Sequence, residues 1–224
     1  MEESKKQKEQ SRKEKTQRAH RSSAESRLSD IWYPPTLRLG LCEHMTTEER
    51  AILVGLDQIL RSEKVRTLIR PVVNRVRAKL SREKSLLMAW EPIPATIYGG
   101  SLPGAIKSSW VFVLRAGANT GAERHPNSHQ RMMSFQGSGD MQMQEGSSAP
   151  NHERWQSKIL ISDSEAPLEK RWISIPRNVW HQPVISKETD WVVVSFHTVP
   201  AEELIEERPE SSGQDRTKQM RYLG

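Results

Sequence analysis

Short apolar runs separated by turn residues are the feature that most limits how this chain can fold. From residue 86 onward no run is long enough for a buried helix, and glycine or proline stands between many of them. Such runs are typical of strands, and many short strands between turns indicate an all-β sandwich or barrel. The predicted strands cover residues 86–90, 110–114, 131–136, 140–144, 157–161, 172–175 and 191–197.

Before the strands, the apolar residues recur at helical spacing. The sequence Thr46-Thr47-Glu48-Glu49 predicts a helix start, because threonine caps helix N-termini and early glutamates suit the positive end of the helix. A second helical pattern runs from about Val65 to Leu80, and we expect Pro71 to break or kink it. The residues expected to be buried against the barrel or a second subunit are Leu53, Leu56, Leu60, Leu68 and Val72.

The ends of the chain are polar. Residues 1–30 are rich in Lys, Arg, Glu, Gln and Ser, which predicts a disordered basic tail. We therefore divide the chain into this tail, an extended segment with two helices at 31–84, a barrel at 85–208 and a flexible C-terminal tail at 209–224. A last helical turn is expected over 202–207.

Composition narrows the function classes. The 224 residues include one cysteine, Cys42, which excludes a disulfide framework and zinc sites built from cysteine pairs and favours a cytoplasmic location. The N-terminus has no apolar core for a signal peptide, and no apolar run suits a membrane helix. The net charge is +6, but the basic face of the second helix is more typical of a solvated surface than of a nucleic-acid contact. Neither a membrane nor a nucleic acid is an expected partner.

Two segments carry a recognisable pattern. The first is GAERHPNSHQ at 121–130, followed by FQGSG at 135–139, and the second is IPRNVWH at 175–181. They resemble the two motifs of the cupin superfamily: a His-x-His pair, then a Glu and a strand ending in Gly, and later a Pro-x-Gly-x-x-His. The resemblance spans about residues 109–198. It implies a mainly β fold, a double-stranded β-helix or jelly-roll barrel, with one metal ion held at its mouth.

The sequence departs from these motifs at three positions. Glu123 stands where the first His is expected, and Asn178 replaces the Gly of the second motif. Counting back from the motif glycine, Gln130 stands where the Glu is expected, while a slip of one residue would bring in His129 instead. The implied ligands of a divalent transition metal (Fe, Zn, Mn or Ni) are therefore Glu123, His125, Gln130 and His181.

Alternation in a strand supports part of this set, because residues 123 and 125 would face the same way. His197 on the last predicted strand is expected in the core or on the surface. The resulting hypothesis is a metal-binding cupin protein, with a dioxygenase or a related metalloenzyme of small molecules as the specific form. The expected partners are a small-molecule ligand or substrate, and the sequence is compatible with a homodimer.

The alternative is a non-catalytic cupin module that has lost its metal and binds a small molecule or serves as a dimer scaffold. A third hypothesis, a regulator whose basic helices contact nucleic acid, needs a recognition element that the sequence does not provide. The fold does not decide among these functions, because one fold hosts many of them.

Overall fold

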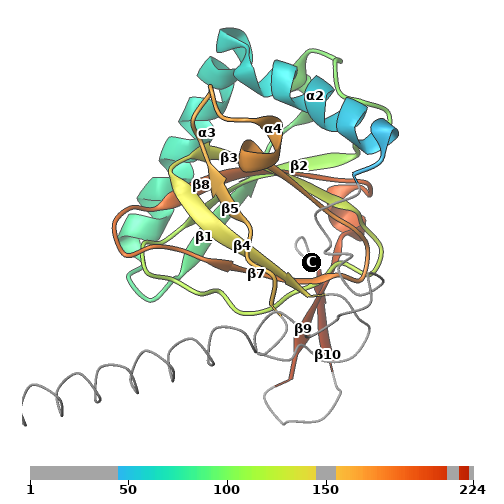
Figure 1. Cartoon of the computed structure of the whole chain (residues 1–224). Helices are drawn as coiled ribbons and strands as arrows, with labels where there is room; N and C mark the ends of the chain where they lie inside the picture. Colours follow the sequence, from blue (N-terminus) through green and yellow to red (C-terminus); the bar gives the residue numbers. More distant parts are fainter. Residues whose placement is uncertain (1–44, 145–154, 211–216, 222–224) are drawn as a thin grey trace, which may run out of the picture. The chain divides into compact units, whose positions relative to one another are not determined.

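The computed structural model describes residues 45–144, 155–210 and 217–221, which all belong to one compact unit, Gly40–Gly224. The predicted tail at 1–30 and the extended segment that follows it lie outside the described residues. Two helices precede a set of antiparallel strands, and a two-stranded ribbon follows them (Figure 1). No helix in the described ranges is both long and apolar enough to span a membrane.

The two helices begin at hydroxyl caps. Thr46 Oγ1 accepts a hydrogen bond of 3.1 Å from the backbone N of Glu49 and starts α2, Thr47–Arg61. Ser62 ends α2 and caps α3, Glu63–Arg82, where its Oγ accepts from the N of Val65 at 3.3 Å. The helix α3 continues through Pro71, so the break considered from the sequence does not occur.

Helix burial agrees with the sequence pattern except at one position. Leu53, Leu56, Leu60 and Val72 are at most 3% exposed, whereas Leu68 is 44% exposed. The buried stripe of α3 includes Val65, Ile69, Val72, Val76 and Leu80. At 100° per residue Leu68 lies about 90° from the middle of that stripe, so its side chain faces solvent and the prediction of its burial was wrong.

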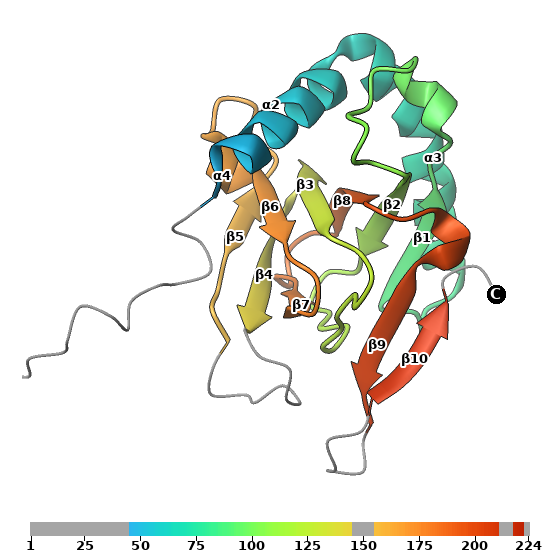
Figure 2. The ribbon, with the colours of Figure 1, turned by 90° about the vertical axis from the view of Figure 1, so that its right-hand side faces the viewer.

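Two antiparallel sheets form the barrel (Figure 2). The larger one has the order β1-β2-β8-β3-β6, and its strands are Met88–Pro92, Ser108–Leu114, Trp191–His197, Gln130–Gln136 and Trp172–Ile175. The smaller one has the order β5-β4-β7, with strands Ile159–Ile161, Ser138–Gln144 and Trp180–Val184. A separate ribbon pairs β9, Ile205–Pro209, with β10, Thr217–Arg221. Short helical turns lie at Ala95–Tyr98 (η2), Leu168–Arg171 (α4) and Ala201–Glu203 (η4).

The larger sheet is buried on both faces, which explains its nearly continuous apolar sequence. Along β2, Val111 and Val113 pack with the helices, while Trp110, Phe112 and Leu114 belong to the barrel interior. The strand β8 alternates in the same way, but its inward positions become polar toward its end, where the buried Ser195 and His197 lie. This polar end of the interior is where the candidate site forms.

Buried ion pairs join α2 to the barrel. Arg131 donates to both carboxylate oxygens of Glu49, at 2.7 and 2.6 Å. Arg171 and the indole of Trp172 both donate to Asp57, the latter at 2.8 Å. Since Arg131 lies on β3 and Trp172 begins β6, these contacts fix the helix over the strands that lead into the site.

Three described strands were not predicted from the sequence. The strand β7 contains proline and glutamine, while β9 and β10 are mainly charged or polar, so none shows an apolar pattern. The helical turn expected over 202–207 is limited to η4, and β9 follows it. The tail expected to be flexible from 209 contains β10, which is held by backbone pairing from Thr217 with Pro209 to Arg221 with Ile205. These differences correct the C-terminal part of the predicted organisation.

Candidate metal centre

Backbone pairing brings the two motifs together. Glu123 and His181 form an antiparallel bridge in which the N–H of each donates to the carbonyl of the other, both at 2.8 Å. Residues opposite each other in such a pair project to the same side. The N–H of Asn178 also donates to the carbonyl of His125 at 3.1 Å, which docks the second motif on the first. Asn178 stands where the motif has glycine, and its backbone has a positive φ of 64°. After glycine, asparagine is among the residues that adopt this left-handed conformation most readily.

Three side chains converge at this junction. One ligand atom each from Glu123, His125 and His181 lies within 4.8 Å of the others, and all three residues are buried. We refer to these three residues as the candidate centre. Nε2 of His181 lies 3.4 Å from Oε1 of Glu123. Two ligands on a tetrahedral ion with bonds of about 2.1 Å would be about 3.4 Å apart, so this pair has a spacing that suits a metal.

The two imidazoles are oriented by the main chain. Nδ1 of His125 donates to the carbonyl of Ile205 at 3.0 Å, and Nδ1 of His181 donates to the carbonyl of Val179 at 3.1 Å. A carbonyl oxygen only accepts, so each Nδ1 carries a proton, and the neutral form of each ring would have its lone pair on Nε2. Nε2 of His181 is buried and has no hydrogen-bond partner among the described residues. This is the tautomer and the orientation that metal-binding histidines need.

Arg208 on β9 adds a cation to the centre. Its Nη2 donates to Oε2 of Glu123 at 2.7 Å, its Nη1 donates to the carbonyl of Thr120 at 2.7 Å, and its Nε donates to Glu206. Burial raises the pKa of Glu123, but the facing imidazole of His181 and the guanidinium of Arg208 outweigh burial and lower that pKa to about 2. Burial, together with the neighbouring His181, lowers the pKa of His125 to about 4. The ionised carboxylate and the neutral imidazole are the forms that bind a metal.

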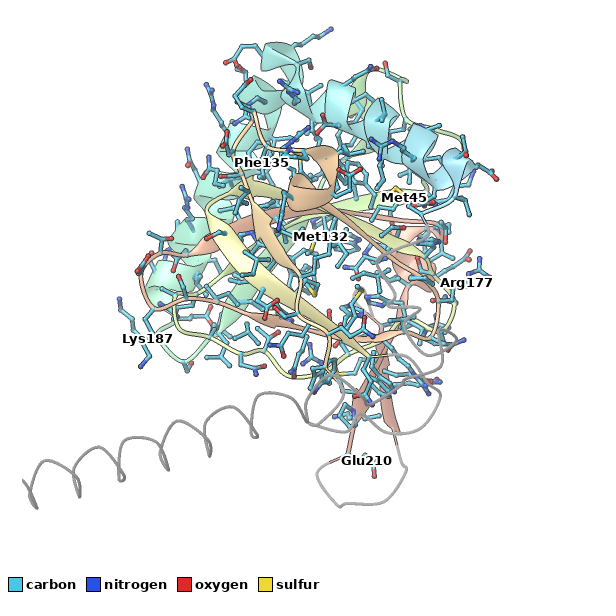
Figure 3. All side chains as sticks on the ribbon, in the orientation of Figure 1. Met45, Met132, Phe135, Arg177, Lys187 and Glu210 are labelled. Atoms are coloured by element: carbon cyan, nitrogen blue, oxygen red, sulfur yellow. The ribbon has the colours of Figure 1, made fainter. Side chains whose placement is uncertain are left out.

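Gln130 lies beside the centre in a small cavity. Glu123, Gln130 and Thr120 line this cavity of about 20 Å³ together with apolar side chains, among them Met132. Met132 is one of the residues labelled in Figure 3. Nε2 of Gln130 donates to Ser195 at 3.1 Å, whereas its Oε1 and the hydroxyl of Thr120 are buried without a hydrogen-bond partner in the described ranges. The space is enough for about one water or one ion.

Comparisons with solved structures give similarities at low identity. No family model matches the chain, and no curated protein matches it in sequence. A crystal structure of a Bacillus halodurans protein is 20% identical over 43% of this chain and 64% of that one, with a TM-score of 0.35. Oxalate decarboxylase of Lactobacillus farciminis, in its formate complex, is 10% identical over 51% of this chain and 29% of that one, with a TM-score of 0.37. KdgF of Halomonas sp. is 12% identical over 50% of this chain and 80% of that one, with a TM-score of 0.35. The chain thus spans less than two thirds of the first two of these proteins.

The strand arrangement decides the fold. A five-stranded and a three-stranded antiparallel sheet form the barrel, with one motif entering β3 and the other linking β6 to β7 at the same end. This barrel is a jelly roll, the fold that the sequence resemblance implied. The two segments that carry the sequence resemblance meet in this barrel, and Glu123, His125 and His181 lie together where they meet.

The strand register of the barrel separates His129 from the centre and leaves His197 beside it. His129 points away from it, since its Nε2 lies 2.6 Å from the hydroxyl of Ser174 and 3.7 Å from Glu49 under α2. Gln130 is the inward neighbour, as the count from Gly137 predicted. His197 is buried with its ring centroid 5.0 Å from that of His125, and its two nitrogens lie 3.3 and 3.1 Å from serine hydroxyls. Those contacts make His197 a core neighbour of the centre.

Several basic side chains of α3 have partners within the described part of the chain. Arg66 lies over the ring of Phe135 at 4.9 Å, and Lys79 lies 5.9 Å from the centroid of Trp90. The remaining partners are carboxylates and an amide: Arg70 with Glu63, Arg75 with Glu91 and Arg77 with Gln136.

Neither Arg208 nor Thr120 was predicted as part of the site from the sequence. Arg208 is 85 residues from Glu123 and lies in a charged segment expected to be helical or loose. Only the pairing of Arg124 with Glu207, which sets β9 against the first motif, brings Arg208 over the centre.

Proposed function

We propose that this cupin protein binds one divalent transition metal (Fe, Zn, Mn or Ni) through Glu123, His125 and His181, with Gln130 beside the ion. The observation that carries this proposal is the convergence of two buried imidazoles and one carboxylate, in which a backbone carbonyl holds each Nδ1 and Nε2 of His181 lies 3.4 Å from Oε1 of Glu123. Two histidines and one carboxylate are a usual ligand set for non-haem iron, with positions left for other ligands.

The activity that fits this ligand set best is that of a small-molecule dioxygenase or a related metalloenzyme. A bound metal of this kind would supply Lewis-acid chemistry or the activation of dioxygen. The chain's own residues supply the surroundings. Gln130 and Thr120 offer hydrogen-bonding groups in the cavity beside Glu123, and apolar side chains such as Phe112 and Met132 exclude bulk water from it.

A second candidate function also has a specific observation in its favour. Glu123 already has a cationic partner in Arg208, at 2.7 Å, and this ion pair compensates the buried carboxylate without a metal. In that case the barrel would be a binding module or a dimer scaffold. The two candidates differ in whether the purified protein retains metal.

Elemental analysis of the full chain, purified without added metal or chelator, tests the proposal. We expect about one equivalent of a transition metal in the wild type and less than about a tenth of that in His181→Ala, because two remaining ligands hold an exchangeable ion poorly. The variant's circular dichroism must match the wild type. Metal at the same level in both proteins, or none in either after incubation with each of the four ions, would favour the module.

A further inference from the structure

His197 is a buried histidine that the proposed ligand set does not use. It ends β8 directly opposite Gln130, which begins β3, and both side chains are buried. The two ring nitrogens of His197 contact hydroxyl groups: Nε2 lies 3.1 Å from Oγ of Ser195, and Nδ1 lies 3.3 Å from Oγ of Ser128. A histidine placed in this way connects the hydrogen bonds on its two sides.

These hydrogen bonds form a chain that begins at Gln130. Its Nε2 donates to Oγ of Ser195 at 3.1 Å, which leaves the proton of that hydroxyl for Nε2 of His197. Burial lowers the pKa of His197, so the ring is neutral, accepts at Nε2 and donates at Nδ1 to Ser128. The hydroxyl of Ser128 then donates to the carbonyl of His129 at 3.1 Å. Every hydrogen bond in the chain therefore points away from Gln130.

The chain determines which end of the Gln130 amide is left for the centre. Ser195 holds the amide N–H, whereas Oε1 is buried and has no hydrogen-bond partner among the described residues. Gln130 and Glu123 line the same small cavity. An amide N–H could donate to the carboxylate of Glu123 directly, but an amide oxygen beside a carboxylate needs a cation or a hydrogen-bond donor between them. This orientation of the amide suits a bound cation.

We propose that His197 and Ser195 are positioning residues for the candidate centre. Acting through Ser195, His197 holds the amide of Gln130 so that its oxygen is left for the ion, which makes Gln130 an oxygen ligand and not a hydrogen-bond donor. Without this chain the amide could turn over, because its two ends have nearly the same size. The inference rests on the function proposed above, since it needs an ion at the centre.

The zinc affinity of the full chain, measured by competition with a chelating indicator, tests this inference in a double-mutant cycle. Ser195→Ala removes the group that holds the amide N–H and should weaken zinc binding about tenfold, since partners of metal ligands typically contribute about 10–100-fold. In the Gln130→Ala background the same substitution should change the affinity by less than about twofold, because no amide is left to hold. A merely structural effect of Ser195→Ala would be equal in both backgrounds.

The variant His197→Phe tests the more distant residue. Phenylalanine keeps a ring next to His125, where the two ring centroids lie 5.0 Å apart, but it has no nitrogen to accept from Ser195. The hydroxyl of Ser195 can then donate to Oε1 of Gln130 and turn the amide over, so zinc binding should again weaken about tenfold. In a Gln130→Glu background His197→Phe should have less than about a twofold effect, because both ends of a carboxylate are oxygens.

The matched control is Ser134→Ala. Ser134 is buried on β3, as Ser195 is on β8, but its hydroxyl contacts the indole of Trp191 and the carbonyl of Gly137 instead of Gln130 or His197. This variant should have a lower melting temperature and the zinc affinity of the wild type within about twofold. A tenfold loss in Ser134→Ala would show that any lost serine in the barrel weakens the centre, and it would overturn the inference.

The other outcomes separate this inference from the proposal on which it rests. In a wild type that binds zinc, an equal loss in both Gln130 backgrounds, or an unchanged affinity in Ser195→Ala or in His197→Phe, would overturn the positioning role and leave the metal proposal in place. A wild type that binds none of the four ions would refute the metal proposal and this inference with it. Circular dichroism checks that each variant folds, and the cycle can be completed with either Ser195→Ala or His197→Phe.

Discussion

At the scale of single residues, the orientation of the imidazoles leads to a direct test with two neighbouring histidines. His125→Ala should reduce metal retention at least about tenfold, because it removes one of three proposed ligands. His129→Ala should retain metal at the wild-type level, since His129 contacts Ser174 and Glu49 under α2. Elemental analysis after dialysis measures both. Loss of metal in His129→Ala would contradict the placement of His129 outside the centre, and full retention in His125→Ala would contradict the role of His125 as a ligand.

The buried histidines also predict a dependence of stability on pH in metal-free protein. Burial lowers the pKa of His125 from 6.5 to about 4, so the unfolded chain binds a proton that the folded chain does not. The stability that the buried, neutral His125 contributes is fully present above pH 6.5 and is lost as the pH falls toward 4. The free energy of unfolding should drop by about 2 kcal/mol from this residue between pH 7 and pH 5.

Urea denaturation at the two pH values measures this drop. The variant His125→Gln should show a smaller one, while His197, whose pKa burial also lowers, keeps part of the effect. The carboxylate of Glu123 interferes little, because its pKa is lowered from 4.5 to about 2 and its contribution to stability is lost mainly below pH 4.5. An equal drop in the free energy of unfolding in the variant and the wild type would contradict the assignment to His125.

From the sequence, only those site residues could be predicted that lie close together within a recognisable motif. The separation of Glu123 and His125 by one residue, and the distance from Pro176 to His181, are visible without a structure. Arg208 was not predictable, because its contact with Glu123 depends on the pairing of β9 with the first motif. That pairing uses backbone N–H and C=O groups, which nearly all residues carry, so it cannot be recognised from the residue types.

At the scale of elements, two leucines on the helices form a matched pair for stability. Leu56 in α2 is fully buried, whereas Leu68 in α3 is 44% exposed. Leu56→Ala should lower the free energy of unfolding by about 2–5 kcal/mol through lost burial and a cavity. Leu68→Ala should change it by less than about 0.5 kcal/mol. Chemical denaturation measures both, and a small effect at Leu56 would mean that α2 contributes little to the fold.

The strand β4 contains a glycine, Gly139, that packs against an indole. A Cβ on Gly139 would lie 2.1 Å from a ring atom of Trp191, so the indole occupies the space of the missing side chain. Gly139→Ala should therefore destabilise the protein by about 2 kcal/mol or more. Gly104→Ala is the control, because a Cβ there meets nothing within 4 Å. Equal melting temperatures for the two variants would contradict this packing.

The strands that could be predicted are those whose side chains carry the pattern. The strands β2 and β8 are buried on both faces and read as apolar runs. The strands β7 and β9 are short and rich in polar residues, and they are held by pairing to β4 and to β10. Whether these two segments form strands depends on partners that are distant in sequence, and the hydrophobic periodicity of a segment does not identify such partners.

At the scale of the whole molecule, metal binding and folding should be linked, because the proposed ligands come together only in the fold. An ion that binds only the folded chain, at a free concentration 100 times its dissociation constant, stabilises the fold by about 2.7 kcal/mol. For a chain of this size that corresponds to a rise of about 5–10 °C in melting temperature. Differential scanning calorimetry with and without Zn²⁺ should show this rise in the wild type and its loss in His181→Ala. A similar rise in both would place the binding elsewhere.

The carbonyls of Val179 and Ile205 orient the two imidazoles, and every amino acid carries the same carbonyl. Selection at positions 179 and 205 should therefore act weakly on the identity of the residue and strongly on the path of the chain. Homologues with the same centre would be free to vary there while conserving the length of the loop before β7 and of the connection into β9. Insertions and deletions in these two connections, more than substitutions, are the changes by which this lineage would lose its centre.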